Sequence, residues 1–359
     1  MGLFSRNRSE EDQQLAEISY LRRLNISGNA YGIDLGSCNI KLYSKSTGRI
    51  SVQKNMIAIR GRESTIACGN AAYEMYEKAP SSITVSYPII GGVIADIFSM
   101  EEVLRAMMRS LQKGALRPAD FVISVPTDVT EVERRAFYDL IKEAGVKAKN
   151  VVGVEKPIAD ALGLGIDVKN CQGALIVDVG YDTTEISVLS MGGIVLTKLL
   201  KTGGHVFDNA IISAVRREFN LVIGNKTAET ARLALGQRKV PQISIYGRDV
   251  VTGLPTQKIL TQEFVLTSLS EYINSMVEQV RVMLERTPPE LSADIYRQGI
   301  FVTGGACQQE GLVECMQDTL NLNINVADSP VHTVALGLAQ VINKPHYRSL
   351  AYMIEGLGQ

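Results

Sequence analysis

Two stretches far apart in the sequence repeat the same arrangement of an acidic residue and a glycine. Asp34 stands one apolar residue before Gly36 in YGIDLGSCNIKLY, and Asp178 stands in the same way before Gly180 in ALIVDVGYDTTEISV. Backbone N–H groups of such tight turns can cradle phosphate oxygens, and two carboxylates can hold a hydrated magnesium ion nearby. A single Asp-x-Gly is weak evidence, because most such turns are ordinary hairpin turns. The repetition predicts a phosphate site at which Asp34 and Asp178 face one another across a cleft.

A third glycine turn, VTGGAC at residues 302–307, follows another short apolar run. Glycine has no Cβ, so the backbone of this turn can approach a nucleoside closely. The alternative is a plain connection between a strand and a helix.

The residues around the first turn predict the elements that must hold it. Residues 31–43 read as a strand, a tight turn and a second strand. A helix ending near Gly145 could be capped by Thr127 or Thr130. Further strands are predicted at 121–126 and 151–154, and helices at 101–114, 130–145 and 157–165. Strands that alternate with helices favour an α/β architecture.

The organisation of residues 31–43 recurs at residues 174–188, which predicts a duplicated fold. The second half continues with helices at 207–219 and 263–286, polar turns within 222–262, a loop at 287–294 and a strand at 300–305. At the other end, residues 1–28 read as a polar tail followed by a short amphipathic helix with leucine or isoleucine at every third position. The alternative for this segment is a solvated tail and a helix packed on its own domain.

Length and composition are those of a globular protein with two lobes. The chain has 359 residues, and a single hydrophobic core rarely extends over so long a chain. Two lobes of roughly 150 residues each are therefore expected. Hydrophobic residues make up 45% and charged residues 21%, which argues against disorder and fibrous repeats. The net charge of -1 gives no general attraction to nucleic acid, and we expect no nucleic-acid partner.

The five cysteines are scattered without a C-x-x-C pair, and no two of the three histidines have metal-ligand spacing. This favours reduced thiols over a disulfide framework or a zinc site. No apolar run approaches the roughly 20 residues that span a bilayer, and the N-terminus lacks the order of a signal peptide. We therefore expect a cytoplasmic protein.

Long motifs make the chain resemble the MreB family of bacterial actins over nearly all of residues 29–345. They include GIDLGSCNIKLY, PIIGGVIADI, DVTEVERRAF, VEKPIADALGLG, VDVGYDTTEISVLSMGGIV, GGHVFDNAII, TAETARLALG, TPPELSADIYRQGIFVTGG and LNINVADSPVHTVALGLAQVI. TPPELSADI followed by GIFVTGG separates this family from sugar kinases and DnaK-type chaperones, which share the actin ATPase fold.

The resemblance implies an α/β actin-like ATPase fold, in which duplicated ribonuclease H-like lobes surround a nucleotide cleft. The implied parts are an N-terminal tail and helix at 1–28, lobe I at 29–170 with a small subdomain at about 61–100, lobe II at 171–345 with a small subdomain at about 204–264, and a C-terminal tail at 346–359 that packs on lobe I.

The resemblance also assigns roles to residues, with ATP or ADP and magnesium as cofactors. Asp34 and Asp178 would face the magnesium ion through water. The nucleotide-binding residues would be Gly36, Ser37, Cys38 and Asn39 in the first phosphate loop, Gly180, Tyr181, Asp182 and Thr183 in the second, Glu229, Thr230, Ala231 and Arg232 beside the ribose and adenine, and Gly304, Gly305, Ala306 and Cys307 in the adenosine turn.

Several positions depart from the family pattern. Ser37 and Cys38 stand where the family usually has Thr and Ala, and Ala306 and Cys307 also differ from the usual residues. Tyr181 and Asp182 replace two glycines, which brings Cβ atoms and a carboxylate to a place where backbone should approach phosphate. Unless Asp182 turns outward or recruits magnesium, its charge should weaken triphosphate binding.

The departure at VEKP bears directly on catalysis. The family places a glutamate before this proline to orient the attacking water, and here the position is Lys156. An ammonium has no acceptor lone pair and cannot do this. Glu155 is adjacent, but one position at a helix start rotates a side chain by roughly 100°. We therefore expect very slow or absent hydrolysis, and Lys156 could instead pair with a phosphate.

The implied function is a cytoskeletal protein that forms filaments at the inner face of the cytoplasmic membrane and determines rod shape by scaffolding cell-wall elongation. Implied partners are further copies of the chain, the membrane surface, and elongation proteins of the RodZ and MreC/MreD type. Ala115 and Leu116 match a membrane-inserting loop, and Leu3 and Phe4 could add to it. Two alternatives stay open, namely a degenerate regulatory paralogue that co-assembles with a competent MreB and an active ATPase or kinase of the same fold.

Overall fold

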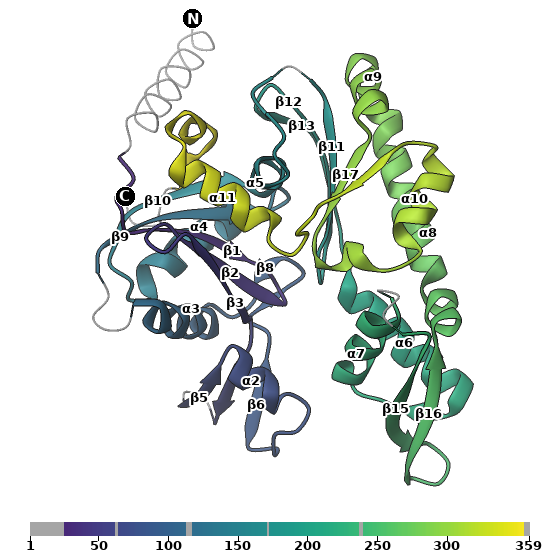
Figure 1. Cartoon of the computed structure of the whole chain (residues 1–359). Helices are drawn as coiled ribbons and strands as arrows, with labels where there is room; N and C mark the ends of the chain where they lie inside the picture. The colour runs from purple at the N-terminus through teal and green to yellow at the C-terminus, as the bar shows by residue number, and fades with distance from the viewer. Residues whose placement is uncertain (1–24, 62–63, 113–116, 171, 237–239, 355–359) are drawn as a thin grey trace, which may run out of the picture. The chain divides into compact units, whose positions relative to one another are not determined.

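The computed structural model describes residues 25–61, 64–112, 117–170, 172–236 and 240–354 (Figure 1). The chain divides into two compact units. Unit 1 comprises Met1–Lys169 and His332–Gln359, and unit 2 comprises Asn170–Val331. From the sequence we expected the second lobe to extend to residue 345, whereas residues from His332 onward belong to unit 1. The reason is packing, since Leu338 lies against Gly32 of the first strand.

Unit 1 is built on a six-stranded sheet of order β19-β10-β9-β1-β2-β3 (Figure 1). Its strands are β1 (Ala30–Leu35), β2 (Asn39–Ser44), β3 (Arg49–Lys54), β9 (Ala119–Val125), β10 (Ala148–Glu155) and β19 (Tyr352–Met353). The strands β1, β2 and β3 form an antiparallel meander, β9 and β10 run parallel to β1, and β19 pairs antiparallel with β10. The last described residues of the chain are therefore tied to the sheet of unit 1.

Strand alternation decides which side chains of β1 enter the core and which face the other side. Tyr31 and Ile33 belong to the core that packs under α3 (Ile97–Gln112) and α4 (Glu131–Glu143). Successive side chains point to opposite faces. Gly32 accordingly lies against α11 (Thr333–Asn343), and Asp34 shares its face. The same side carries α5 (Lys156–Gly163), which packs on α11.

Short elements complete unit 1. A three-stranded sheet of order β5-β4-β6 and the helix α2 surround a small core of Met56, Ala58 and Ala72. The bounds are β4 (Ile57–Arg60), β5 (Ser64–Cys68), α2 (Asn70–Met75), β6 (Ile83–Ser86), the hairpin β7 (Ile89–Ile90) and β8 (Val93–Ile94), and η2 (Pro345–Leu350).

Unit 2 repeats the topology of unit 1 around a five-stranded sheet of order β13-β12-β11-β17-β18. Its strands are β11 (Ala174–Val179), β12 (Thr184–Ser190), β13 (Gly193–Leu200), β17 (Ile300–Thr303) and β18 (Ile324–Val326). An antiparallel meander again leads to two parallel strands, as β3-β2-β1-β9-β10 does in unit 1. The duplication predicted from the two hairpins is present in the strand order.

Helices and a second small sheet cover the core of unit 2. They are α6 (Gly204–Phe219), α7 (Asn225–Leu235), α8 (Gln262–Arg286), α9 (Pro289–Gln298), η1 (Gly305–Gln308) and α10 (Leu312–Leu320), with β14 (Leu221–Val222), β15 (Gln242–Asp249) and β16 (Pro255–Thr261). Leu175, Val177 and Val179 of β11 pack in the same core as Phe207 of α6 and Val277 of α8.

Two details of the helices bear on the sequence predictions. Thr130, one of the two expected caps, forms a capping box with Glu133 at the start of α4. The loop predicted at residues 287–294 is wrong, because α9 begins at Pro289. Proline lacks only an N–H that the first helical turn leaves unused, Glu290 suits the helix N-terminus, and Ile295 is fully buried.

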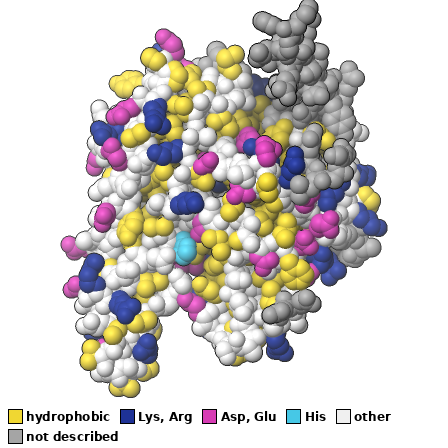
Figure 2. All heavy atoms as spheres, turned by 180° about the vertical axis from the view of Figure 1, so that it is seen from behind, with side chains coloured by type: hydrophobic (Ala, Val, Ile, Leu, Met, Phe, Trp, Pro, Cys, Tyr) yellow, Lys and Arg dark blue, Asp and Glu magenta, His cyan; other side chains and the backbone are white. Residues whose placement is uncertain are grey.

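The described surface shows no single dominant sign of charge on the face drawn in Figure 2, where acidic and basic side chains are interspersed. Among the described helices, none combines the length and apolar character needed to cross a bilayer.

Candidate functional site

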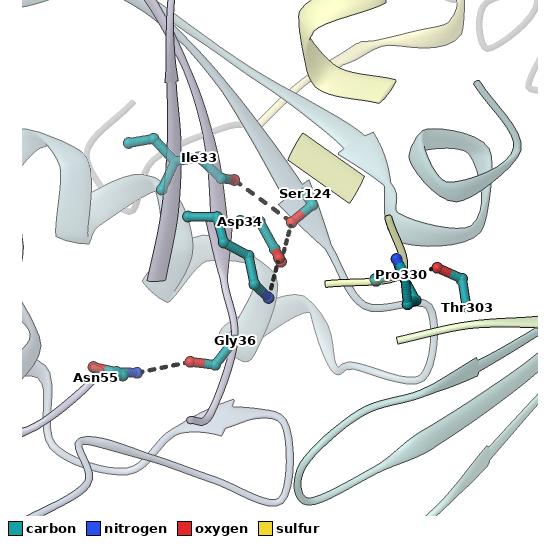
Figure 3. A network of polar contacts seen from close by, with 8 residues as sticks. Ile33, Asp34, Gly36, Asn55, Ser124, Thr303 and Pro330 are labelled. Carbon is teal, nitrogen blue, oxygen red and sulfur yellow. Dashed lines mark hydrogen bonds and ion pairs between the residues drawn. The ribbon is translucent and has the colours of Figure 1, made fainter. Parts of the chain in front are cut away.

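The first glycine turn joins β1 to β2. Asn55, which follows directly after β3, holds this turn by hydrogen bonds. A Cβ on Gly36 would come within 2.7 Å of the Asn39 carbonyl oxygen, so only glycine fits this turn without a shift. The Asn55 side-chain amide donates to the Gly36 carbonyl at 3.0 Å (Figure 3). The Asn55 backbone N–H donates to the Cys38 carbonyl at 2.8 Å. Ser37 and Cys38 are buried within the turn.

Asp34 lies just before this turn, and both of its carboxylate oxygens are bonded. Lys41 Nζ lies 2.8 Å from Oδ2, and the Ser124 hydroxyl donates to Oδ1 at 3.2 Å (Figure 3). The pairing follows from register, because Asp34 stands opposite Lys41 in β2, and Ser124 follows the residue of β9 opposite Ile33. Burial raises the pKa of Asp34, but Lys41, Lys156 and the two hydrogen bonds outweigh it, so the pKa is lowered. Asp34 is therefore a buried, ionised carboxylate.

Two lysines contact the first turn or its aspartate, and a third acts on the aspartate through its charge. Lys41 Nζ would lie 3.3 Å from a Cβ built on Gly36, which places it beside the turn itself. Lys54 Nζ donates to Cys38 Sγ at 3.3 Å and lies 4.3 Å from the centre of the Tyr73 ring. Lys156 acts on Asp34 through its charge. The turn and its aspartate are therefore in contact with, or under the influence of, three positively charged side chains.

Glu155 and Lys156 occupy the junction of β10 and α5. The Glu155 carboxylate accepts a hydrogen bond from Arg134 Nη1 of α4 at 2.7 Å. Arg134 in turn stacks over the Tyr352 ring at 5.1 Å. Burial and the charge of Glu155 raise the pKa of Tyr352 well above its usual range. Glu155 is thus engaged with α4 and β19, while Lys156 is the member of the pair whose charge reaches Asp34.

The second glycine turn, in unit 2, rests on the start of α6. Gly180 N–H donates to the Thr183 carbonyl at 2.9 Å, and Gly204 N–H donates to the Gly180 carbonyl at 3.0 Å. A Cβ on Gly203 would come within 2.6 Å of the carbonyl oxygens of Gly180 and Tyr181, so this contact depends on glycine.

Tyr181 and Asp182, the residues that depart from the family's glycines, both engage His205. The rings of Tyr181 and His205 are stacked with centroids 5.3 Å apart, and His205 Nδ1 lies 3.3 Å from Asp182 Oδ1. The hydrogen bond to Asp182 raises the pKa of His205, although burial opposes it. The carboxylate of Asp182 therefore lies close to the imidazole of His205 and favours the protonated form of that ring.

The third turn meets the second inside unit 2. Asp178 stands opposite Thr303, and a Cβ on Gly304 would lie 2.1 Å from Asp178 Oδ1, so only glycine allows this approach. Burial and the charge of Asp178 raise the pKa of the Cys307 thiol to about 12, which keeps it protonated and unreactive. Gly305 is exposed at the surface of this turn.

The segment expected to contact ribose and adenine lies on α7. Arg232 Nε pairs with Asp208 Oδ1 at 2.7 Å, and both side chains are buried. Burial raises the pKa of Asp208 despite the charge of Arg232. Ala231 is fully buried in the core, whereas Thr230 is exposed and Glu229 is half-buried. Arg232 thus ties α7 to α6, which leaves Glu229 and Thr230 as the accessible residues of this segment.

A Cβ built on Gly204 would be 3.2 Å from Arg232, 3.5 Å from Ala306 and 3.5 Å from the Tyr181 ring. The second turn, the third turn and α7 therefore come together at the N-terminus of α6.

The residues of unit 1 do not fit a magnesium ion bound at Asp34. Magnesium takes carboxylate oxygens and waters in an octahedral arrangement. Both oxygens of Asp34 are already bonded, one of them to an ammonium whose charge repels a cation. Within the described residues, no group of three or more His, Cys, Asp or Glu side chains could hold a metal ion.

Four expected membrane-facing residues, Leu3, Phe4, Ala115 and Leu116, lie outside the described residues.

Four residues at the two turns were not predicted from the sequence, namely Lys41, Lys54, Ser124 and His205. The signal for Lys41 was present, because a hairpin that turns over residues 36–38 places residue 41 opposite Asp34.

Comparison with known proteins gives consistent matches over most of the chain. The model of the MreB/Mbl protein family matches residues 28–349. The cell shape-determining protein Mbl of Bacillus subtilis (strain 168) is 34% identical over 318 residues, covering 87% of this chain and 95% of Mbl. The cell shape-determining protein MreB of Escherichia coli (strain K12) is 34% identical over 320 residues, covering 86% and 92%.

Solved structures agree. The crystal structure of MreB 5 of Spiroplasma citri bound to AMPPNP superposes with a TM-score of 0.83 at 32% identity, covering 89% of this chain and 96% of that chain. The MamK double helical filament matches with a TM-score of 0.73 at 20% identity over 88% and 99% of the two chains, which supports the actin-like fold alone.

Proposed function

Because the chain belongs to the MreB/Mbl family and has the actin-like fold, we propose that it is a cytoskeletal protein that binds ATP or ADP and assembles into filaments. The observation that carries the proposal is the same Asp-x-Gly turn at the same strand position in both units, with Asp34 at the end of β1 and Asp178 at the end of β11. The Spiroplasma citri relatives bound to AMPPNP and ADP support a nucleotide as the ligand.

The proposed phosphate-binding residues are Gly36, Ser37, Cys38 and Asn39 in one turn and Gly180, Tyr181, Asp182 and Thr183 in the other. Backbone N–H groups of such turns suit phosphate oxygens. Gly304, Gly305, Ala306 and Cys307, together with Glu229 and Thr230, are proposed to contact the nucleoside. Arg232 contributes by holding α7 on α6 through Asp208.

Nucleotide hydrolysis is proposed to be very slow or absent. Lys156 stands at the position of the water-orienting glutamate and has no acceptor lone pair. Glu155, the adjacent carboxylate, is engaged by Arg134 at 2.7 Å. In this proposal the nucleotide is a structural ligand that stabilises the assembling form. Magnesium at Asp34 is not included, because the bonds already made by Asp34 do not suit it.

We further propose that the filaments lie at the inner face of the cytoplasmic membrane and scaffold cell-wall elongation with proteins of the RodZ and MreC/MreD type. Leu3, Phe4, Ala115 and Leu116 would supply the apolar contacts. A buried leucine contributes only about 2 kcal/mol. Many copies along one filament multiply so weak an anchor.

A second candidate, a regulatory paralogue that co-assembles with a competent MreB, is favoured by one observation. Tyr181 and Asp182 replace glycines in the second turn and are tied to His205, so the turn carries bulk and charge that a competent loop lacks.

Sedimentation on anionic liposomes, with and without ATP, tests the proposal. The purified full chain should pellet as filaments with ATP, and pelleting should increase when liposomes are present. A chain that binds ATP but pellets only after addition of a competent MreB would support the second candidate. A chain that neither binds nor pellets contradicts both.

A further inference from the structure

The turn between β1 and β2 is surrounded by positive charge that the chain itself supplies. Lys41 Nζ lies beside Gly36, Lys54 Nζ contacts Cys38, and Lys156 acts on Asp34 from the start of α5. Of the three, Lys41 is the one bonded to the carboxylate of Asp34. A turn of this kind is a place for an anion, since each ammonium is a donor that suits phosphate oxygens.

The Lys41–Asp34 pair is not an ordinary surface ion pair. The side chain of Lys41 is 15% exposed and that of Asp34 is 5% exposed. Ser124 fixes the second carboxylate oxygen at 3.2 Å, and Asn55 fixes the turn at Gly36. Water screens such a pair less than it screens pairs at the surface. The ammonium of Lys41 is therefore held in one place, next to the backbone of the turn.

Nucleotide sites in other proteins commonly hold a divalent cation. Magnesium ions at nucleotide sites are held through one or two carboxylates and neutralise phosphate charge. Here Oδ2 of Asp34 already faces an ammonium, and Oδ1 accepts a hydrogen bond from Ser124. The ammonium also repels a second cation at short range.

We infer that Lys41 supplies the counter-charge that a divalent cation would otherwise supply at this turn, so that nucleotide binding does not require magnesium. The inference rests on the proposed nucleotide-binding function and specifies its cofactor requirement. Lys54 and Lys156 add positive charge near the same turn. Lys41 is the lysine that is bonded to Asp34 and lies beside Gly36.

Isothermal titration of the full chain with ATP and with ADP tests this, in magnesium buffer and in EDTA. The dissociation constants in the two buffers should agree within about threefold, which is under 1 kcal/mol. Lys41→Gln retains a hydrogen-bond donor toward Asp34 but loses the charge. It should bind at least about tenfold more weakly in EDTA and recover in magnesium, a change of about 1.4 kcal/mol.

Two controls separate charge from packing. Lys41→Arg keeps the charge and should bind without magnesium. Lys149→Gln removes an exposed lysine of β10 in the same unit and should behave like the unchanged chain in both buffers. Circular dichroism of each variant verifies that it is folded.

The outcomes also distinguish this inference from the proposed function. Binding in magnesium that is lost in EDTA overturns the inference and leaves the proposed function standing. Absence of binding in both buffers overturns the two together. If Lys41→Gln binds nucleotide equally well in magnesium and in EDTA, Lys41 is not the group that replaces the divalent cation, and the inference is wrong.

Discussion

Asp34 keeps a full negative charge where little water reaches it, because Lys41 and Ser124 bond both of its oxygens. A buried carboxylate without such partners would take up a proton instead. The sequence predicted the position of Asp34 but expected it to face magnesium. The motif specifies the aspartate and the glycine, while the ammonium comes from the opposite strand and is visible only once the hairpin register is considered.

Lys156→Glu tests the role assigned to the residue that opens α5. A carboxylate can accept a hydrogen bond from the attacking water, and a positioned general base typically contributes about 10²–10⁴-fold. We expect phosphate release at saturating ATP to rise at least about tenfold above that of the unchanged chain. Saturation matters because the variant also loses a positive charge near Asp34.

The matched control is Lys149→Glu, the same change at an exposed position of β10, which should leave phosphate release unchanged. Equal rates for the unchanged chain and Lys156→Glu would contradict the role assigned to Lys156.

The Asp182–His205 pair gives a prediction about pH. The hydrogen bond from His205 to Asp182 raises the pKa of His205 above its unfolded value near 6.5. The Asp182–His205 pair therefore contributes its full stabilisation of the folded protein below about pH 6.5. This contribution is lost as the pH rises through the pKa of His205 in the folded protein. Asp182→Asn should lower the pKa of His205 in an NMR titration, and should cost more thermal stability at pH 6 than at pH 9.

The effect on stability will be small, because the His205 side chain is 46% exposed and water screens the pair. His205→Gln identifies the resonance among the three histidines. An unchanged His205 pKa in Asp182→Asn would mean that Asp182 is not its effective partner.

At the scale of elements, the hairpins were predictable and the helix after α8 was not. The apolar run before each Asp-x-Gly and the polar turn after it specify β1–β2 and β11–β12 locally. Residues 287–294 carry two prolines, which favoured a loop, yet Ile295 buries against unit 2 and Pro289 suits a first helical turn. Burial of one face of α9 in the core of unit 2 favours the helix, and the two prolines alone do not indicate this burial.

The packing of α5 on α11 is set by small residues and can be tested directly. A Cβ on Gly337 would lie 1.8 Å from the Ala159 carbonyl oxygen, and a Cβ on Gly163 would lie 2.0 Å from that of Thr333. Gly337→Ala should destabilise the protein by about 1–3 kcal/mol through overpacking, measured by urea denaturation. Because α5 begins at Lys156, weaker ATP binding should accompany the loss of stability.

Leu336→Ala is the control for this helix, since Leu336 is the neighbouring residue of α11 and is 38% exposed. It should change stability by about 0.5 kcal/mol or less, as surface substitutions usually do. Similar costs for the two variants would show that α5 and α11 do not depend on the glycine contact.

Across the chain as a whole, the duplication gives each unit its own Asp-x-Gly turn. Each unit ends its first strand in an Asp-x-Gly turn and places a hydroxyl residue of the parallel neighbour beside the aspartate, Ser124 next to Asp34 and Thr303 opposite Asp178. The units then diverge, with Lys41 opposite Asp34 and Glu185 opposite Asp178. The shared topology was predictable from the repeated motif. The division of the chain at His332 was not, because it depends on how α11 packs.

We propose that the chain assembles with nucleotide but does not hydrolyse it. The most direct measurement is phosphate release in the same samples in which filaments are pelleted, with radiolabelled ATP and a competent MreB as the positive control for hydrolysis. We predict that the pellet contains filaments and uncleaved ATP over many hours. Filaments that release about one phosphate per subunit within minutes would contradict the account of Lys156.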